Sequence, residues 1–154
     1  MNILQSADEL QRLTYDLAHY YNLCDRYTTQ KLGITGAQGY ILLAIPENSQ
    51  ISMNDLSIKM RLANSTMTRM VDQLVQKGMV TRESDHHDRR IVLVQLTDQG
   101  TNVRKKFKEA LQSLFSQVLG EILETERMDI LKSLSVFNDA IIKTLKSCCE
   151  EDML

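Results

Sequence analysis

The stretch of sequence that decides the fold runs from Leu74 to Gly100 and reads LVQKGMVTRESDHHDRRIVLVQLTDQG. It begins with the end of a helical apolar stripe, and Gly78 stands where a left-handed helix C-cap is expected. Two segments rich in β-forming residues follow at 79–84 and 91–96, and a charged loop joins them. Thr97 then suits the N-cap of another helix. The stretch therefore predicts a helix, a β-hairpin with a polar loop, and a second helix.

Three short helices are predicted upstream of Gly78. Thr35-x-x-Gln38 has the spacing of a capping box and opens a helix that Pro46 closes, and Ser52-x-x-Asp55 opens a second one. The third has apolar residues at the i, i+3, i+4, i+7 spacing of one buried side, namely Met67, Met70, Val71 and Leu74. Two short helices joined by a tight turn and followed by a hairpin form a winged helix-turn-helix.

Longer helices are predicted on both sides of this module. Ser6-x-x-Glu9 is expected to cap the first, and Thr97 and Gly120 precede the last two. Their apolar stripes are Leu10, Leu13, Leu17, Tyr20, Cys24 and Tyr27, then Val103, Phe107, Leu111, Leu114 and Val118, then Met128, Leu131, Leu134, Phe137, Ile141 and Leu145. The expected fold class is therefore mainly α with a small β-hairpin wing (α+β), a winged helix-turn-helix flanked by N- and C-terminal dimerisation helices.

The apolar stripes of the long helices are too large for a small winged module to cover. Leaving half of these side chains in water would forgo on the order of 10 kcal/mol, which is comparable to the stability of a whole domain. We therefore expect a homodimer, with an N-terminal dimerisation helix in 1–30, the winged helix-turn-helix in 31–100, and helices that complete the dimerisation region in 101–154. An intramolecular bundle in a monomer is the alternative.

Charge is unevenly distributed along the chain. The whole sequence has 18 basic and 20 acidic residues and a net charge of −2, whereas residues 59–90 include seven basic and four acidic ones. The polar side of the third short helix carries side chains that can hydrogen-bond to base edges in the major groove of DNA, namely Asn64, Ser65, Thr66, Thr68, Arg69 and Gln73. This pattern predicts a DNA-reading helix, and the alternative is an ordinary solvated face.

The hairpin loop is the second predicted DNA contact. A narrow loop can reach the minor groove or the flanking phosphates, and its candidate residues are Arg82, His86, His87, Arg89 and Arg90. Asp88 is expected to brace the loop or to orient Arg90 through a charge-assisted hydrogen bond. A further phosphate contact is predicted for Thr35 and Gln38. A solvated turn is the alternative for the loop.

These residues resemble the multiple antibiotic resistance regulator (MarR) family of bacterial transcription factors. The family's pattern around the wing is matched by Leu74, Lys77, Gly78, Arg82, Asp88, Arg90, Leu96, Thr97 and Gly100, and its upstream landmarks by Ile34, Thr35, Gln38, Asp55 and Leu56. The resemblance implies a homodimer that binds double-stranded DNA, with Arg90 contacting DNA from the wing. The residues that it implies read bases are Asn64, Ser65, Thr66, Thr68 and Arg69. Two positions depart from the family: Ala63 replaces a common capping serine, and His86 a common wing proline.

Other classes of function fit the sequence less well. Neither a G-x-S-x-G elbow, a P-loop, H-E-x-x-H nor G-x-G-x-x-G occurs, so we do not expect an enzyme. A winged-helix protein-interaction module without DNA binding is the main alternative of another class, and it would not share the steep salt dependence of DNA binding. The sequence shows neither a bilayer-spanning apolar run nor a signal-peptide pattern at its start, so we expect a cytoplasmic protein.

Two kinds of regulation are open at this point. The family resemblance implies small effectors that are often anionic aromatics, and a pocket for one would involve Arg12, Tyr15, His19, Tyr20 and Tyr40, although core packing is the plainer interpretation. Cys24 would sense oxidants if it were exposed as a thiolate, and it would be an inert thiol if buried in its apolar stripe. The three cysteines have no disulfide or zinc spacing, and we expect no metal or other cofactor.

Overall fold

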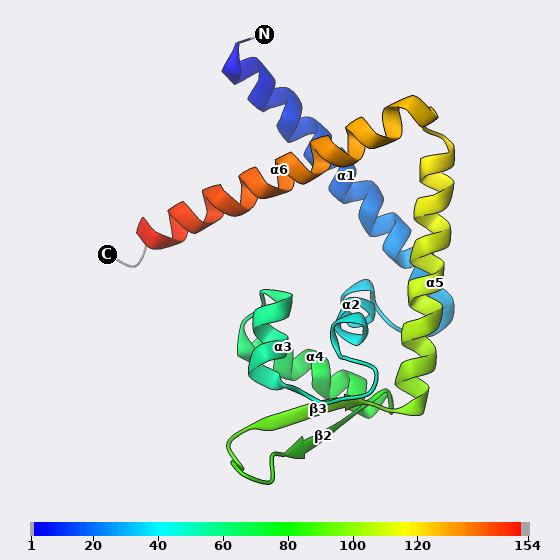
Figure 1. Ribbon diagram of the computed structural model, residues 1–154, viewed down its shortest axis with the longest axis vertical. Coiled ribbons are helices and arrows are strands. Elements are labelled where there is room, and N and C mark those ends of the chain that lie inside the picture. The colour runs from blue at the N-terminus through cyan, green and yellow to red at the C-terminus, as the bar shows by residue number, and fades with distance from the viewer. Residues whose placement is uncertain (1, 152–154) are drawn as a thin grey trace. The chain divides into compact units, whose positions relative to one another are not determined.

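The computed structural model describes residues 2–151, with side chains described for 2–147, and the chain divides after Gln112 into two compact units. Figure 1 shows the elements along the chain. The first unit contains α1 (Ile3–Thr29), the 3-10 turn η1 (Gln30–Leu32), α2 (Gly36–Ala44), β1 (Ile51–Ser52), α3 (Met53–Met60), α4 (Asn64–Gln76), β2 (Val80–Ser84) and β3 (Val92–Leu96). It also contains the first part of α5 (Asp98–Gly120), and the second unit holds the rest of α5 and α6 (Glu124–Glu151).

The winged helix-turn-helix predicted from the sequence is confirmed, and its sheet has one strand more than expected. The antiparallel strands lie in the order β1–β3–β2, with Ile51 opposite Val94 and Val80 opposite Leu96. The loop between β2 and β3 projects beyond the helices of the first unit (Figure 1). The prediction contained the hairpin of β2 and β3 but not β1. A two-residue strand such as β1 is too short to leave an alternating pattern in the sequence.

One apolar core holds the helices of the first unit against its sheet. Met67, Val71 and Leu74 of α4 are fully buried, as the predicted stripe requires. They belong to one cluster with Ile41 of α2, Leu56 of α3, Val94 of β3 and Phe107 of α5. Met70, the fourth residue of the predicted stripe, is half-buried against the same cluster, so the opposite side of α4 is left to face solvent.

Three of the four predicted helix N-caps are confirmed, and one of them is Thr97 before α5, whose Oγ1 accepts from the Gly100 N–H at 3.0 Å. At α2 the Gln38 N–H donates to Thr35 Oγ1 and the Thr35 N–H to Gln38 Oε1, both at 3.2 Å, which completes the capping box. At α3 the Asp55 N–H donates to Ser52 Oγ at 3.0 Å. The start expected at Ser6 was wrong, because α1 begins at Ile3 and the Asn2 N–H donates to Gln5 Oε1.

The long helices leave much apolar surface uncovered within each unit. In α1, Leu10, Leu13 and Leu17 are about half exposed, and in α6 Leu134 and Leu145 are as well. Neither these helices nor any other in the described part of the chain is long and apolar enough to cross a membrane. Exposed apolar stripes of this kind are typical of surfaces that contact another molecule.

Candidate nucleic-acid interface

Several polar side chains on the solvent-facing side of α4 have no intramolecular partner among the described residues. Ser65 and Arg69 are exposed, and neither side chain makes a hydrogen bond or ion pair to the described residues. Thr66 is half-buried, and the Thr68 hydroxyl donates back to the Asn64 carbonyl at 2.8 Å. Ser65 and Arg69 thus keep their hydrogen-bonding capacity for an external ligand.

The first turn of α4 is anchored to α3 through Asn64. Its Oδ1 accepts a hydrogen bond from the Ser57 hydroxyl, so its amide group remains as a donor on an exposed side chain. The N-cap is Ala63, which offers no side-chain oxygen. The backbone N–H groups of this first turn therefore lack a side-chain cap, and they can donate to an anion or a base edge.

Two predicted contacts, Gln38 and Gln73, hydrogen-bond to each other, although Gln73 itself stays exposed. Gln38 is buried, its Nε2 donates to Gln73 Oε1 at 2.9 Å, and its Oε1 accepts from Lys77 Nζ at 2.9 Å. Lys77 Nζ also donates to the Gly33 carbonyl at 2.6 Å. The phosphate contact expected of Gln38 is thus wrong for this conformation, because burial and three partners occupy its amide. Thr35, its predicted companion, is exposed at the helix start.

Arg82 also has a role different from the predicted one. Its guanidinium forms an ion pair with Asp72 of α4, and the Arg82 side chain is only 29% exposed. Arg82 therefore fastens β2 to the recognition helix, and we no longer assign it to the DNA-contacting residues. The error arose because a charge pattern along the chain does not show which partner lies on a neighbouring element.

Backbone hydrogen bonds to two aspartates hold the wing loop. Asp88 Oδ1 accepts from the Arg90 N–H at 2.9 Å, so Asp88 braces the loop through the backbone of Arg90 rather than through its guanidinium. Asp85 Oδ1 accepts from the N–H groups of His87 and Asp88, at 2.7 and 3.1 Å. This role of Asp85 was not predicted, although an aspartate at the start of a turn is a recognised signal.

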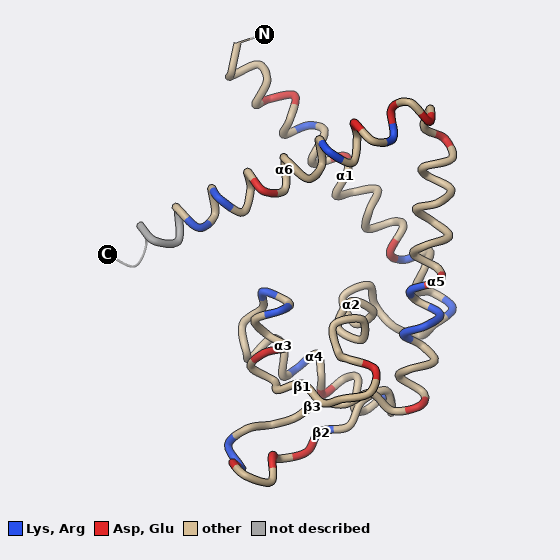
Figure 2. The backbone as a smooth tube through the Cα atoms, viewed as in Figure 1, with Lys and Arg blue, Asp and Glu red and all other residues tan. Residues whose placement is uncertain are grey.

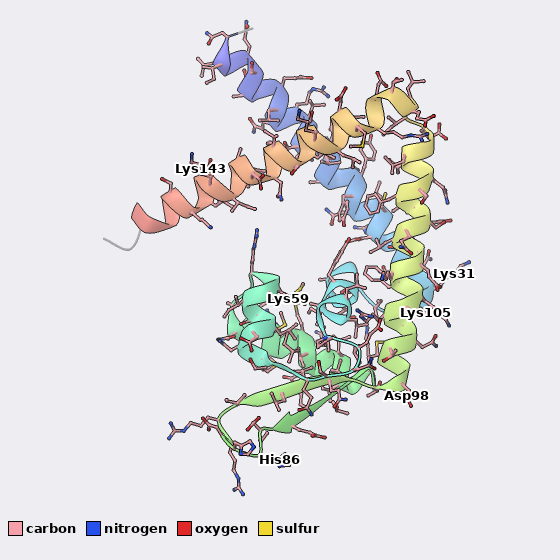
Figure 3. All side chains as sticks on the ribbon, viewed as in Figure 1. Lys31, Lys59, His86, Asp98, Lys105 and Lys143 are labelled. Atoms are coloured by element: carbon pink, nitrogen blue, oxygen red, sulfur yellow. The ribbon has the colours of Figure 1, made fainter. Side chains whose placement is uncertain are left out.

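The loop braced in this way presents four polar or cationic side chains to solvent. His86, His87, Arg89 and Arg90 are all exposed, and Figure 3 shows His86 at the tip of the wing. A groove of about 420 Å³ lies between the wing and the two helices of the helix-turn-helix. It is lined by Arg90 to Val92 of the wing, Asn64 and Thr68 of α4, and 52–55 at the start of α3. Arg90 is thereby placed beside Asn64 and Thr68 of α4.

Basic residues outnumber acidic ones in the part of the first unit that contains α4 and the wing, where residues 59–90 include seven basic and four acidic side chains. Residues 56–71 contain Lys59, Arg61 and Arg69 and no acidic residue. Figure 2 shows basic segments both at the wing loop and at the C-terminal end of α3. Such a surface attracts a polyanion, even though the whole chain has a net charge of −2.

Removing the Asp85 carboxylate is expected to loosen the wing. The hydrogen bonds from the His87 and Asp88 backbones lower the pKa of Asp85, so the brace persists above its ordinary pKa and is lost as the pH falls through the lowered value. In Asp85→Ala, we expect the His87 and Asp88 amides to exchange with solvent roughly fivefold faster at pH 7. Asp85→Asn keeps the accepting oxygen and serves as the control. Equal exchange in both variants would contradict the brace.

The five residues predicted to line an effector pocket do not form one cluster. Arg12 makes ion pairs with Glu9 and Asp16 on the surface of α1. Tyr15, His19 and Tyr20 are exposed on the same helix. Tyr40 instead packs its ring edge-to-face on Phe107, with 5.5 Å between centroids, and its hydroxyl bonds to Tyr21. Burial, followed by the Tyr21 hydrogen bond, raises the pKa of Tyr40, as expected for a packing residue.

A different groove, of about 910 Å³, lies between the C-terminal half of α1 and the start of α2. Its polar lining includes Asn22, Asp25, Arg26 and Thr35, and none of the five predicted residues borders it. Burial raises the pKa of Asp25, whose Oδ1 has no partner among the described residues. The groove thus combines a cation with polar groups beside the N-terminus of α2.

The described residues contain one free cysteine, and they contain no group of three side chains suited to a metal ion. Cys24 is a free, half-buried thiol on α1, and Cys148 and Cys149 lie beyond the side chains that the structure describes. Across residues 2–147, no three His, Cys, Asp or Glu side chains are grouped to hold a metal ion. A redox role for Cys24 stays a prediction.

The fold and the exposed side of α4 define a class of protein, the winged helix-turn-helix. Residues 34–92 match the sequence model of the MarR family. Over 67% of its length the chain is 31% identical to the uncharacterised HTH-type transcriptional regulator YdgJ of Bacillus subtilis, of which it covers 63%. It is 28% identical to the HTH-type transcriptional repressor MdtR of the same organism, over 64% of each chain. The chain thus spans just under two thirds of these two relatives.

A solved structure agrees with these sequence matches. A MarR mutant from E. coli in complex with operator DNA aligns with a TM-score of 0.75 at 25% identity, over 89% of this chain and 99% of that one. Residues 34–92 of the chain thus match the MarR family, as the pattern of the wing and helix-turn-helix residues predicted.

Proposed function

We propose that this protein is a sequence-specific DNA-binding transcriptional regulator. The observation that carries the proposal is the pair of unpartnered side chains, Ser65 and Arg69, on the solvent-facing side of α4, next to a wing that presents Arg90. Serine and arginine both pair with base edges in the major groove, and arginine does so bidentately with guanine. An arginine on a narrow loop reaches the minor groove or the phosphates beside it. A regulator of this kind acts at the chromosome, in the cytoplasm.

The regulator is proposed to act as a homodimer. Support comes from the half-exposed leucines of α1 and of α6, which a second copy would cover. A two-fold dimer presents two α4 helices to half-sites about one helical turn apart, so the operator is pseudopalindromic. Repression is the proposed outcome, and the relative MdtR is itself named a repressor.

A small anionic effector is proposed to modulate DNA binding from the groove between α1 and α2. Arg26 supplies a cation there, and the N-terminus of α2 supplies backbone N–H groups. Gln38, in the first turn of α2, hydrogen-bonds to Gln73 of α4 and to Lys77 directly after it. A ligand that displaces α2 would therefore also change the position of α4. Oxidation of Cys24 is the alternative form of regulation. Thermal shifts with benzoate, and with peroxide on Cys24→Ser, separate the two.

Selection of bound fragments from genomic DNA, followed by titration at several salt concentrations, tests the function. We expect one enriched sequence with two-fold symmetry and an affinity that falls steeply with salt, because phosphate contacts release counterions. A protein-interaction module with the same fold would enrich no sequence and would bind no duplex at low salt. That result would overturn the proposal.

A further inference from the structure

The turn that joins α3 to α4 contains an arginine in a backbone conformation that favours glycine. Arg61 has φ 53° and ψ 44°, and it is the only non-glycine residue with positive φ among residues 2–151. Its N–H donates to the Ile58 carbonyl at 3.0 Å, and the Leu62 N–H to the Ser57 carbonyl at 3.0 Å. The second bond closes a turn of six residues, 57–62, which is the pattern of the Schellman motif. The left-handed residue of that motif is usually glycine. The turn thus carries strain that a glycine would remove.

Nothing within the described chain compensates for that strain. The Arg61 side chain is exposed, and its guanidinium has no hydrogen bond or ion pair to the described residues. Lys59, two residues earlier and labelled in Figure 3, differs in this respect because its Nζ donates to the Ala44 carbonyl at 2.8 Å. One cation at this end is therefore used inside the fold, and the other faces solvent.

The position of Arg61 indicates what it binds. It stands three residues before Asn64, the first residue of the recognition helix. When the N-terminal end of such a helix enters the major groove, the turn before it passes the sugar-phosphate wall of that groove. We propose that Arg61 contacts a DNA phosphate there and fixes the entry of α4 into the groove. The contact rests on the proposed DNA-binding function, and it explains why a strained turn carries a cation.

Two substitutions separate the strain from the contact. Arg61→Gly removes both, so we expect its Tm to rise by about 2–4 °C. Its affinity for duplex DNA should fall by about tenfold at low salt, for selected and scrambled sequences alike, because a phosphate carries no sequence information. The slope of log K against log salt should become shallower by about 0.9 for each subunit bound. Arg61→Lys keeps both charge and strain, so its Tm and its salt slope should match those of the unaltered protein.

The outcomes distinguish this contact from the general function. If the unaltered protein binds duplex DNA and Arg61→Gly keeps the same affinity and salt slope, the phosphate contact is wrong and the DNA-binding function stands. If Arg61→Gly lowers the Tm, the turn does not carry the inferred strain, and the inference is overturned on that ground. If the unaltered protein binds no duplex at low salt, both proposals fail together.

Discussion

Replacing Arg69 with alanine is expected to lower the affinity for the selected duplex by at least about tenfold, while the affinity for a scrambled duplex changes by less than about threefold. A bidentate pair between an arginine and a base contributes roughly 1–3 kcal/mol of discrimination, and each subunit of a dimer loses one such pair. Arg69 is suited to this pairing because it is exposed and has no partner in the described chain.

Arg90→Ala is the matched comparison for Arg69→Ala. It removes the same charge from the wing, where contact with phosphate or the minor groove is expected to be less dependent on sequence. We therefore expect a weaker affinity for both duplexes by a similar factor. Titrations of both variants against both duplexes at one salt concentration measure the difference. Unchanged discrimination in Arg69→Ala would remove this residue from the base-reading set.

The parts of the fold that the sequence could predict are those that depend on local pattern. The buried side of α4 followed from the spacing of Met67, Val71 and Leu74, and all three are fully buried. Gly78 has φ 68°, which is the left-handed conformation expected of a C-cap glycine. Capping residues three positions apart located the starts of α2 and α3 for the same reason. Each of these signals lies within a few residues of the structure that it determines.

The predictions that failed are those that depend on a distant partner. Gln38 and Arg82 were assigned to DNA, but their partners lie on α4, at Gln73 and at Asp72, which are 35 and 10 residues away. A polar side chain looks equally available in a sequence whether it faces solvent or a neighbouring helix. The strand β1 was missed because it is only two residues long and its pairing partner Val94 lies far along the chain.

The candidate site was predictable in its location and less so in its composition. Exposure of Ser65 and Arg69 follows from the helical period of α4 alone, since both lie away from the buried stripe. The brace supplied by Asp85 and the strain at Arg61 require the backbone, because an aspartate or an arginine occurs in many loops. The aromatic residues predicted to form a pocket are not gathered around one, since Tyr15 and Tyr20 lie exposed along α1 while Tyr40 packs on Phe107.

Replacing Leu134 of α6 with lysine is expected to convert the protein from a dimer of twice 17.7 kDa to a monomer of 17.7 kDa. Leu134 is 48% exposed within its unit, in the stripe with Leu131 and Leu145 that we propose a second copy covers. An unpaired ammonium group in that interface would occur twice in each dimer and would cost several kcal/mol each time. Asp139→Lys adds the same side chain about 140° around the helix from Leu134, where the chain is also exposed, and should leave the dimer intact.

The same pair of variants connects assembly to DNA binding. A monomer offers one α4 instead of two. Leu134→Lys should therefore lose at least about a hundredfold in affinity for the two-fold symmetric duplex, because binding at one half-site no longer holds a second α4 close to the other half-site. The Tm of Leu134→Lys should not fall in proportion to the affinity, because the core around Met67 and Phe107 lies in the other unit. Light scattering and duplex titration on both lysine variants measure the two effects. A Leu134→Lys protein that remains a dimer, or a monomer that still binds the symmetric duplex as tightly, would contradict the role proposed for α6.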